Sequence, residues 1–346
     1  MSTILVIKLS ALGDVLIASA ALQRIIDHHQ GQQIRLLTAP AFVPLFSAWS
    51  GLEANGFPIQ DWGQVLATGW QLRRSKLQRV YDLQGNKRSR TLSWLSGAPE
   101  RIGLWPGWPY THSSPLPRRP RVHPWLRMNS VLAAVGVPPA EEYSPLPSSD
   151  EARFQAQHWL SGHGLDTAPL VLIHAGCSAR WQSKRWGEAK FLGLARKLSD
   201  GGLTVIWIGG PDDRELNARL SAQVGVNACD AFSISGLIAL GRYARFAITN
   251  DSGPMHALAA ANIPVYSLFG PTDWRLSHAL GQADRVIQAG VDCSPCFKPS
   301  CPLSTDIHRC MQNITAETVF RRLQLDNLIP ANAGTAADIA AVSADD

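Results

Sequence analysis

Short apolar runs alternate with longer segments of helical periodicity along most of the chain. Residues Thr3–Leu9 form an apolar run that predicts a buried strand, and Val15–His29 has apolar positions spaced along one helix face. Two more apolar runs, Ile34–Thr38 and Arg79–Leu83, predict further strands. Strands that alternate with helices through short loops are typical of a parallel sheet with helices on both faces.

The second half of the chain repeats this alternation more regularly. The predicted elements are strands at Leu170–His174, Leu203–Ile208, Phe246–Thr249 and Val265–Phe269, and helices at Gly187–Leu198, Asp212–Val224 and Pro254–Ala261. We therefore expect an α/β protein with a doubly wound parallel sheet in each half. Ligands bind such sheets at the carboxyl ends of the strands.

Proline-rich segments interrupt the alternation at two places. The stretch Leu104–Pro124 is rich in Trp, Pro and Arg, and its prolines exclude a regular helix, so we expect a surface loop. A helix is predicted to resume at Trp125–Val135. Residues 138–150, which read PPAEEYSPLPSSD, predict an interdomain linker.

Length and composition fit a folded protein of about two domains. The 346 residues are 45% hydrophobic and 17% charged. We assign the first domain to residues 1–150 and the second to residues 151–330, whose last helix is a candidate to pack back on the first domain. Residues 331–346 are small and acidic and predict a disordered tail.

The apolar runs are too short for a membrane span. None approaches the ~18 uninterrupted apolar residues that a span requires. Lys8 and Asp14 also interrupt the N-terminal run where a signal peptide would be apolar. We therefore expect a cytoplasmic protein, and contact with the inner face of a membrane stays open.

Positive charge is concentrated in the first half of the chain. Residues 73–127 contain 12 Lys or Arg against two acidic residues, Asp82 and Glu100. Such an imbalance favours a polyanionic partner, although an ordinary solvated surface would also explain it. Nucleic acid is not expected, because no recognition motif for it accompanies the charge.

Three motifs in this order resemble those of the bacterial heptosyltransferases of glycosyltransferase family 9. They read KLSALGDVLIASAAL at residues 8–22, HAGCSARWQSKRW at 174–186, and NDSGPMHALAAANIPVYSLFGPTD at 250–273. The resemblance covers roughly residues 3–328. It implies a GT-B fold, in which two Rossmann-like domains face a central cleft. It also implies transfer of heptose, with inversion, from ADP-heptose to the inner core of lipopolysaccharide. The first domain would then bind the phosphorylated, lipid-linked acceptor and the second the nucleotide sugar, with no cofactor required.

The first motif supplies a candidate general base. Asp14 follows a buried strand and falls in the first turn of a helix, where backbone N–H groups favour a carboxylate. By resemblance Asp14 takes the proton of the attacking hydroxyl, and the alternative is a plain capping role. Gly13 lies beside it, and Lys8 and Ser10 at the same strand end are candidates to orient the acceptor or the leaving phosphate.

The second motif supplies candidate groups for the leaving diphosphate. By resemblance Lys184 stabilises its negative charge, and Ser178 and Arg185 bind the same oxygens. The alternative is that Lys184 and Arg185 are solvated residues at a helix start. A helix start disfavours cations unless an anion is present, which favours a ligand.

The third motif follows a strand and opens a helix, which is an arrangement suited to a pyrophosphate. Ser252 and Gly253 would donate hydrogen bonds to it, whereas Asp251 suits the hydroxyls of the donor sugar. His256, one turn on, is a donor contact or a packed histidine. An acidic residue at another strand end, Asp213 with Asp212 as the near alternative, is a candidate for ribose hydroxyls or for a helix cap.

Four of the six cysteines cluster near the C-terminus. They are Cys293, Cys296, Cys301 and Cys310, spaced C-x2-C-x4-C-x8-C. Four thiols over a short stretch suit structural zinc or iron, although the spacing departs from that of a zinc ribbon. Reduced structural thiols are the alternative.

Two other functions remain open alongside transfer to lipopolysaccharide. The first is a protein heptosyltransferase that modifies autotransporters, and the cysteine cluster is consistent with this function. The second is a non-catalytic protein that binds a sugar nucleotide, although such a protein would not need Asp14 as a base.

Overall fold

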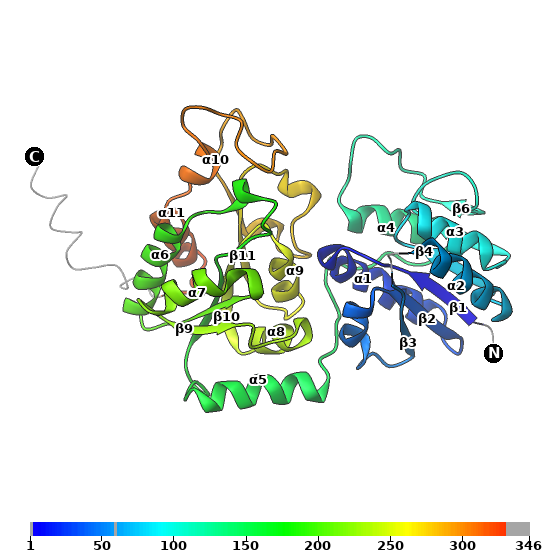
Figure 1. The fold of residues 1–346 in the computed structure, drawn as a ribbon, viewed down its shortest axis with the longest axis horizontal. Coiled ribbons are helices and arrows are strands. Elements are labelled where there is room, and N and C mark those ends of the chain that lie inside the picture. The colour runs from blue at the N-terminus through cyan, green and yellow to red at the C-terminus, as the bar shows by residue number, and fades with distance from the viewer. Residues whose placement is uncertain (1–2, 59–60, 330–346) are drawn as a thin grey trace, which may run out of the picture. The chain divides into compact units, whose positions relative to one another are not determined.

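The computed structural model describes residues 3–58 and 61–329, which form two compact units (Figure 1). Unit 1 contains the chain up to Asp150 together with Arg275–Gly281, and unit 2 contains the rest from Glu151 onward. The predicted tail, 331–346, lies outside the described residues. Among the described helices, none combines the length and the apolar character that crossing a membrane requires.

Unit 1 is built on a six-stranded parallel sheet of order β3-β2-β1-β4-β5-β6. The strands are β1 (Thr3–Ile7), β2 (Gln33–Thr38), β3 (Leu52–Gly56), β4 (Arg79–Asp82), β5 (Glu100–Gly103) and β6 (His112–Ser113). The central strands β1 and β4 are buried almost throughout. After Thr3, β1 is apolar without alternation, as strands covered on both faces are, whereas β4 carries Arg79 and the buried Asp82 at its two ends. The parallel sheet predicted for the first half is confirmed.

The helices of unit 1 cover the sheet in two pairs. They are α1 (Leu12–His28), α2 (Trp62–Arg74), α3 (Lys87–Leu95) and α4 (Pro124–Ala133). Helix α1 packs with α4, and α2 packs with α3. Asp61 caps α2, and Asn86 with Ser89 forms a capping box on α3, which fixes where each helix begins.

Seven residues from late in the chain complete unit 1. His278, in the segment Arg275–Gly281, lies with its ring 4.3 Å from the ring of His123, whose Nε2 donates to the His278 carbonyl at 3.0 Å. His278 Nε2 also lies 3.0 Å from Glu142 Oε1. The sequence patterns did not predict that residues 275–281 belong to unit 1.

Unit 2 repeats the architecture with the strand order β12-β11-β10-β7-β8-β9, again all parallel. The strands are β7 (Leu170–His174), β8 (Thr204–Gly209), β9 (Val226–Cys229), β10 (Ala244–Asn250), β11 (Val265–Phe269) and β12 (Val286–Gln288). The helices are α5 (Asp150–Gly162), α6 (Glu188–Asp200), α7 (Arg214–Ser221), α8 (Ile234–Gly241), α9 (Gly253–Ala259), α10 (Arg309–Gln312) and α11 (Ala316–Leu325).

Helix α11 packs on α6 within unit 2, where Phe320 and Leu323 join the core formed with Phe191 and Leu194. Burial of this apolar stripe keeps the last described helix on its own unit. That this helix also packs back on the first domain stays a prediction, and the late segment that belongs to unit 1 is Arg275–Gly281.

Candidate functional site

In unit 1, the predicted base lies beside a buried lysine. Asp14 occupies the first turn of α1, whose N-cap, Ala11, supplies no side-chain cap. Lys8 follows β1 directly and is buried, and its Nζ lies 3.8 Å from Asp14 Oδ2. Gly13, the second residue of α1, lies on the same turn. The structure thus brings together the residues predicted from the first motif.

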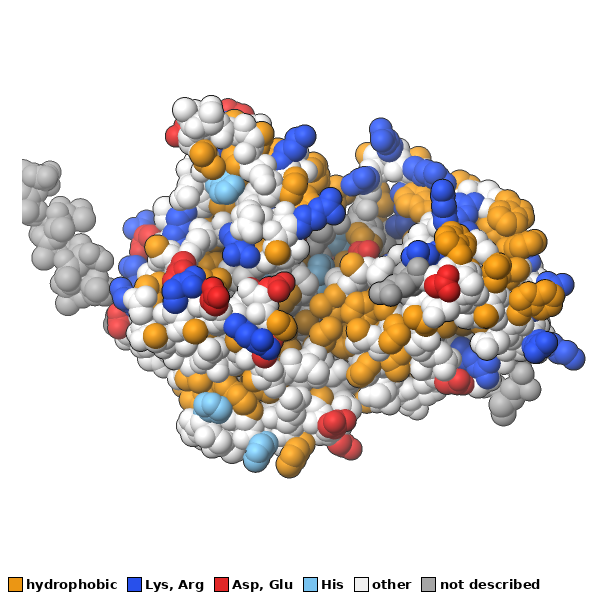
Figure 2. Space-filling view, in the orientation of Figure 1, with side chains coloured by type: hydrophobic (Ala, Val, Ile, Leu, Met, Phe, Trp, Pro, Cys, Tyr) orange, Lys and Arg blue, Asp and Glu red, His pale blue; other side chains and the backbone are white. Residues whose placement is uncertain are grey.

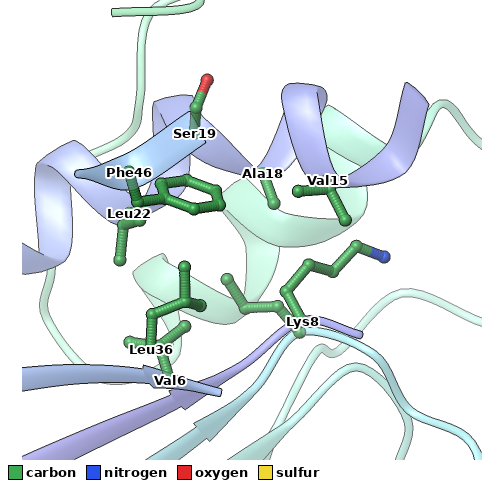
Figure 3. Close-up of a pocket in the computed structure, with 9 residues that line it drawn as sticks. Val6, Lys8, Val15, Ala18, Ser19, Leu22, Leu36 and Phe46 are labelled. Atoms are coloured by element: carbon green, nitrogen blue, oxygen red, sulfur yellow. The ribbon is translucent and has the colours of Figure 1, made fainter. Parts of the chain in front are cut away.

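Apolar side chains surround the stem of Lys8. Figure 3 shows it running beneath Val15 of α1, with its nitrogen directed away from Leu36 and Phe46. Burial lowers the pKa of Lys8, while the carboxylates of Asp14 and Asp82 act to raise it. The ammonium therefore depends on these two acidic neighbours for its charge.

A glutamine from the neighbouring strand end fixes the loop between β1 and α1. Gln84 Oε1 accepts from the backbone N–H of Leu9 at 2.9 Å and of Ser10 at 3.0 Å. Ser10 is thereby held through its backbone. Sequence reasoning missed Gln84, although it follows β4, the strand that pairs with β1.

Asp82, at the end of β4, is a second residue that sequence reasoning did not assign. Its Oδ1 accepts from the N–H groups of Gln84 at 3.0 Å and Gly85 at 2.8 Å, and the Tyr110 hydroxyl donates to Oδ2. Burial raises the pKa of Asp82, and these hydrogen bonds act against it. The charge of Asp82 acts to raise the pKa of Lys8, and its hydrogen bond with Tyr110 holds the loop that carries that residue.

Part of the basic segment serves the fold rather than a partner. Arg127 is buried, stacks 4.2 Å from the Trp105 ring, and donates to the carbonyls of Leu116 and Pro117 at 2.7 Å. Arg101 likewise donates to the Pro109 carbonyl at 2.7 Å. The cations of this loop that are exposed are Arg118, Arg119 and Arg121. A polyanion would meet these three, and Arg127 is a structural residue.

In unit 2, a series of hydrogen bonds links residues that lie at or just after the carboxyl ends of three neighbouring strands, β8, β7 and β10. His174 Nε2 donates to Asp213 Oδ2 at 3.3 Å, and His174 Nδ1 lies 3.1 Å from Ser252 Oγ. The Ser252 hydroxyl also lies 3.1 Å from the Asn250 carbonyl. Because its hydroxyl is engaged there, Ser252 does not cap α9 through its side chain.

The Asp213 side chain has room to make its hydrogen bond with His174 only because the residues next to it are glycines. A Cβ on Gly176 would lie 1.9 Å from Asp213 Oδ1, and one on Gly209 would lie 2.7 Å from Asp213 Cβ. Burial acts to raise the pKa of Asp213, but the His174 hydrogen bond and charge and the Gly210 N–H outweigh it, so the pKa is lowered. The Asp213 carboxylate predicted for ribose is buried and engaged with His174, whereas the alternative, Asp212, is exposed.

Lys184 and Asp251 form a close ion pair beside this series of hydrogen bonds. Lys184 ends the short helix η2 (Gln182–Lys184), and its Nζ lies 2.6 Å from Asp251 Oδ2. Thr272 donates to the same oxygen at 2.6 Å. The Lys184 Nζ also lies 4.7 Å from the centre of the Trp181 ring. Lys184 precedes α6 and is not one of its first-turn residues, so the interpretation of Lys184 as a solvated helix start is wrong.

Arg185 supplies a second cationic group, which contacts the loop after β7. One guanidinium nitrogen donates to the Cys177 carbonyl at 3.3 Å, while Nε is buried and has no hydrogen-bond partner among the described residues. Ser178 is exposed on the same loop. A buried N–H without a partner is costly, which makes it suited to an anionic ligand.

Asn250 organises these loops although sequence reasoning gave it no role. Its Nδ2 donates to the carbonyls of Ala175 and Gly176 at 3.0 and 2.9 Å, and its Oδ1 accepts from the Trp186 N–H at 3.2 Å. The signal that could have found it is its place at the end of β10, the strand that pairs with β7. Gly253 and His256 follow in α9, in the first and second turns.

The four clustered cysteines line one small cavity, together with His308 and Arg309. They are Cys293, Cys296, Cys301 and Cys310. Arg309 Nε donates to Cys293 Sγ at 3.3 Å, and the His308 N–H donates to Cys301 Sγ at 3.2 Å. Burial raises the pKa of the Cys310 thiol, and the neighbouring thiols add to this effect.

Within residues 3–58 and 61–329, no group of three or more His, Cys, Asp or Glu side chains is placed to hold a metal ion. The metal site predicted at the cysteine cluster is therefore not supported. In this arrangement the sulfurs accept hydrogen bonds from Arg309 and from the backbone of His308, and the raised pKa of Cys310 favours a protonated thiol.

Known proteins resemble this chain along nearly all of its length. Lipopolysaccharide heptosyltransferase 1 of Pseudomonas aeruginosa is 28% identical over 317 residues, which cover 86% of this chain and 87% of that protein. A family 9 glycosyltransferase from Veillonella parvula has a TM-score of 0.80 at 22% identity, covering 94% and 96% of the two chains. The E. coli ADP-heptose lipopolysaccharide heptosyltransferase II has a TM-score of 0.75 at 22% identity, covering 95% and 98%.

The two solved structures confirm the predicted GT-B fold of this chain, with its two parallel α/β sheets. The family model described as glycosyltransferase family 9 (heptosyltransferase) matches residues 65–306. The matched residues cover most of the chain. They include the hydrogen-bonded residues His174, Asp213 and Ser252 and the ion pair of Lys184 with Asp251. The protein therefore belongs to glycosyltransferase family 9, the heptosyltransferase family, and is a glycosyltransferase.

Proposed function

We propose that this protein transfers heptose from ADP-heptose to the inner core of lipopolysaccharide, with inversion at the anomeric carbon. The observation that carries the proposal is the buried pairing of Lys184 with Asp251 in a chain of this family, because it sets a cation beside a carboxylate at the carboxyl ends of the sheet. The names of the similar P. aeruginosa and E. coli proteins supply the donor and acceptor classes.

In this proposal unit 2 binds the nucleotide sugar. Lys184 meets the diphosphate as the glycosidic bond breaks, and the unpartnered Nε of Arg185 and the hydroxyl of Ser178 bind its oxygens. The N–H groups of Ser252 and Gly253 donate to the same group. The carboxylate of Asp251, with one oxygen held by Lys184 and Thr272, offers the other to hydroxyls of the donor sugar.

Further contacts would secure the rest of the donor. His256, in α9, is proposed to contact the donor, and Asp213 is proposed to act near the ribose. Because Asp213 accepts from His174 and from the Gly210 N–H, its part is to hold the loops that receive the ribose rather than to present a free carboxylate.

Unit 1 supplies the base in this mechanism. Asp14 removes the proton from the attacking hydroxyl of the acceptor, whose oxygen then bonds to the anomeric carbon on the face opposite to ADP. The bond from that carbon to the diphosphate breaks, and ADP departs with the electron pair. Lys8 positions Asp14 from 3.8 Å, and Ser10 and Gly13 border the acceptor hydroxyl. These groups provide a base and a cation, so we propose that no cofactor is required.

The acceptor is proposed to be the phosphorylated, lipid-linked saccharide that meets unit 1 in the cytoplasm. The exposed cations Arg118, Arg119 and Arg121 suit its phosphates and acidic sugars. The functional division of residues 1–150 for the acceptor and 151–330 for the donor stays part of this proposal.

One experiment separates this function from its alternatives. The purified enzyme is incubated with ADP-heptose and with core acceptors that either lack or carry the first heptose, and ADP release is followed. Release that depends on one of these acceptors supports the proposal. Release only with an autotransporter polypeptide would favour a protein heptosyltransferase. Tight binding of ADP-heptose without release on any acceptor would favour the non-catalytic protein.

A further inference from the structure

Three large apolar side chains form an exposed stripe along α2. Trp62, Leu66 and Trp70 follow one another at intervals of four residues, so they lie on one side of the helix. Their exposed fractions are 49%, 50% and 62%. Val65, Gly69 and Leu72 form the buried side instead. This stripe therefore contributes nothing to the core of unit 1.

Helix α3 and the loop between β5 and β6 extend this stripe into a face. Trp94 of α3 is 49% exposed, Trp108 is 64% exposed, and their rings lie 5.5 Å apart. Helices α2 and α3 pack side by side so closely that a Cβ on Gly69 would lie 2.4 Å from Leu95. The Arg88 guanidinium lies 5.9 Å from the Trp62 ring and bridges the two helices.

We call this surface the tryptophan face; it consists of Trp62, Leu66, Trp70, Trp94 and Trp108. Figure 2 shows hydrophobic and Lys or Arg side chains gathered over the part of unit 1 that carries α2 and α3. Soluble proteins rarely expose so many large apolar side chains together unless they meet a partner.

Positive charge surrounds the tryptophan face. Residues 61–97 contain seven Lys or Arg and two Asp, of which Asp82 is fully buried. Arg73 and Arg74 at the end of α2, and Lys87 at the start of α3, are exposed. A second copy of this chain docked on the same face would bring like charges together, which disfavours a dimer. An anionic surface matches both the charge and the aromatic rings.

We propose that the tryptophan face docks this protein on the surface of an anionic phospholipid bilayer. Trp rings partition to the boundary between headgroups and acyl chains, and nearby Lys and Arg are attracted to anionic headgroups. The stripe on α2 then lies in the interface while the cations border it. The tryptophan face is inferred from surface composition alone, independently of the donor and acceptor proposed above.

Vesicle co-sedimentation tests this docking. The probes are vesicles of phosphatidylglycerol and phosphatidylethanolamine, compared with vesicles of phosphatidylcholine alone. The double variant Leu66→Gln, Trp70→Gln removes two of the three side chains of the exposed stripe without removing a core residue, and Gln favours helix. The matched control is Phe154→Gln, Leu325→Gln in unit 2, where both side chains are exposed. Circular dichroism checks that each variant is folded.

The wild type and the control should bind anionic vesicles at least tenfold more strongly than phosphatidylcholine vesicles. The double variant should lose at least tenfold of that binding, and 500 mM NaCl should weaken the binding of the wild type. Equal binding to both vesicle types, equal loss in the control, or no effect of the double variant would overturn the proposal. So would sedimentation of the wild type as a dimer, in the absence of vesicles, that the double variant abolishes.

Activity distinguishes this docking from the reaction itself. The double variant should transfer heptose to a deacylated, water-soluble acceptor at the wild-type rate, and lose rate only on acceptor embedded in anionic vesicles. A wild type that binds vesicles but transfers heptose to neither acceptor would leave the docking intact and contradict the proposed function.

Discussion

Lys184 Nζ lies 2.6 Å from Asp251 Oδ2, so the cation proposed to meet the leaving diphosphate is already held by a carboxylate. Both side chains are largely shielded from solvent. The arrangement fixes the ammonium in place before the donor arrives, which is the condition for electrostatic stabilisation of a developing charge. It also means that removal of either partner leaves a buried charge uncompensated.

Replacement of Lys184 by Ala should lower kcat by about 10²-fold and weaken donor binding less, because the negative charge on the diphosphate grows as the bond breaks. Steady-state kinetics with ADP-heptose measures both quantities. Lys197→Ala is the matched control, since Lys197 of α6 pairs with Glu317 of α11. A normal kcat with a raised donor KM would make Lys184 a ground-state ligand only.

Replacement of Asp14 by Ala should lower the rate of transfer by ~10²–10⁴ while ADP-heptose binding stays nearly unchanged, because the base acts on the acceptor. Calorimetric titration of the donor and turnover assays measure the two effects separately. Asp27→Ala, in the same helix, removes a carboxylate that bonds Gln23 and should leave turnover unchanged. Normal turnover of the Asp14 variant would remove this residue from the mechanism.

Replacement of Arg118, Arg119 and Arg121 together by Ser should raise the acceptor KM at low salt, as high salt does to the wild type. Exposed charges are screened over ~8 Å at physiological ionic strength, so the acceptor KM should rise with salt more than the donor KM does. The control replaces Arg196, Arg245 and Arg321 in unit 2 by Ser. An unchanged acceptor KM with weakened donor binding would mean that the two units divide their substrates differently.

Substitution of Gly176 by Ala should destabilise unit 2 and weaken donor binding, because the added Cβ would lie 1.9 Å from Asp213 Oδ1 and break the contact with His174. Gly193→Ala is the matched control: it lies in α6 with open space around it and should stabilise the fold by up to about 1 kcal/mol. Thermal unfolding and ADP titration of both variants check this. Equal behaviour of the two variants would contradict the role given to Gly176.

Acid should destabilise unit 1 through two buried histidines. Burial, followed by the charge of Arg79, lowers the pKa of His29 from 6.5 to about 4, and burial lowers that of His123 to about 4. Between pH 6.5 and 4 the unfolded chain therefore binds more protons than the folded one. The free energy of unfolding falls as the pH drops through this range, by at most about 3 kcal/mol for each histidine.

The variant His29→Gln should flatten this pH dependence, because its side chain no longer titrates, although it should be less stable than the wild type at pH 7. Urea unfolding at pH 7, 5.5 and 4.5 measures the effect. His158→Gln, at an exposed position of α5, should keep the wild-type profile. A His29→Gln profile parallel to that of the wild type would show that His29 does not contribute.

The sequence predicted the core of each sheet better than its edges. The runs that became β1, β7 and β11 are mostly apolar, with Thr3, His174 and Ser267 as exceptions, because these strands are covered on both faces. In contrast β3 has largely exposed residues, and α2 places Trp62 and Leu66 on its outer side, so neither shows the periodicity expected of a half-buried element. Those elements were missed.

The candidate site divides in the same way. The family motifs proposed Asp14, Lys184 and Asp251, and the motifs that contain them begin near the carboxyl ends of β1, β7 and β10, where parallel sheets bind ligands. The pairing of Lys184 with Asp251, and the link from Asp213 through His174, depend on which strands are neighbours. The local periodicity of a sequence does not determine the order of strands in a sheet, so these contacts could not be predicted.

Because Arg275–Gly281 belongs to unit 1, this unit is synthesised first but cannot be complete until most of unit 2 has also been synthesised. As the chain leaves the ribosome, the sheet and helices α1 to α4 of unit 1 emerge long before His278. The buried ring of His123 therefore gains the carbonyl that accepts its hydrogen bond only later. A fragment that stops at Asp150 lacks both this acceptor and the His278 ring that lies against His123, so it leaves this part of unit 1 open to water. Any chimera that exchanges unit 1 between relatives must therefore carry residues 275–281 with it, because the first half of this enzyme is finished by its second.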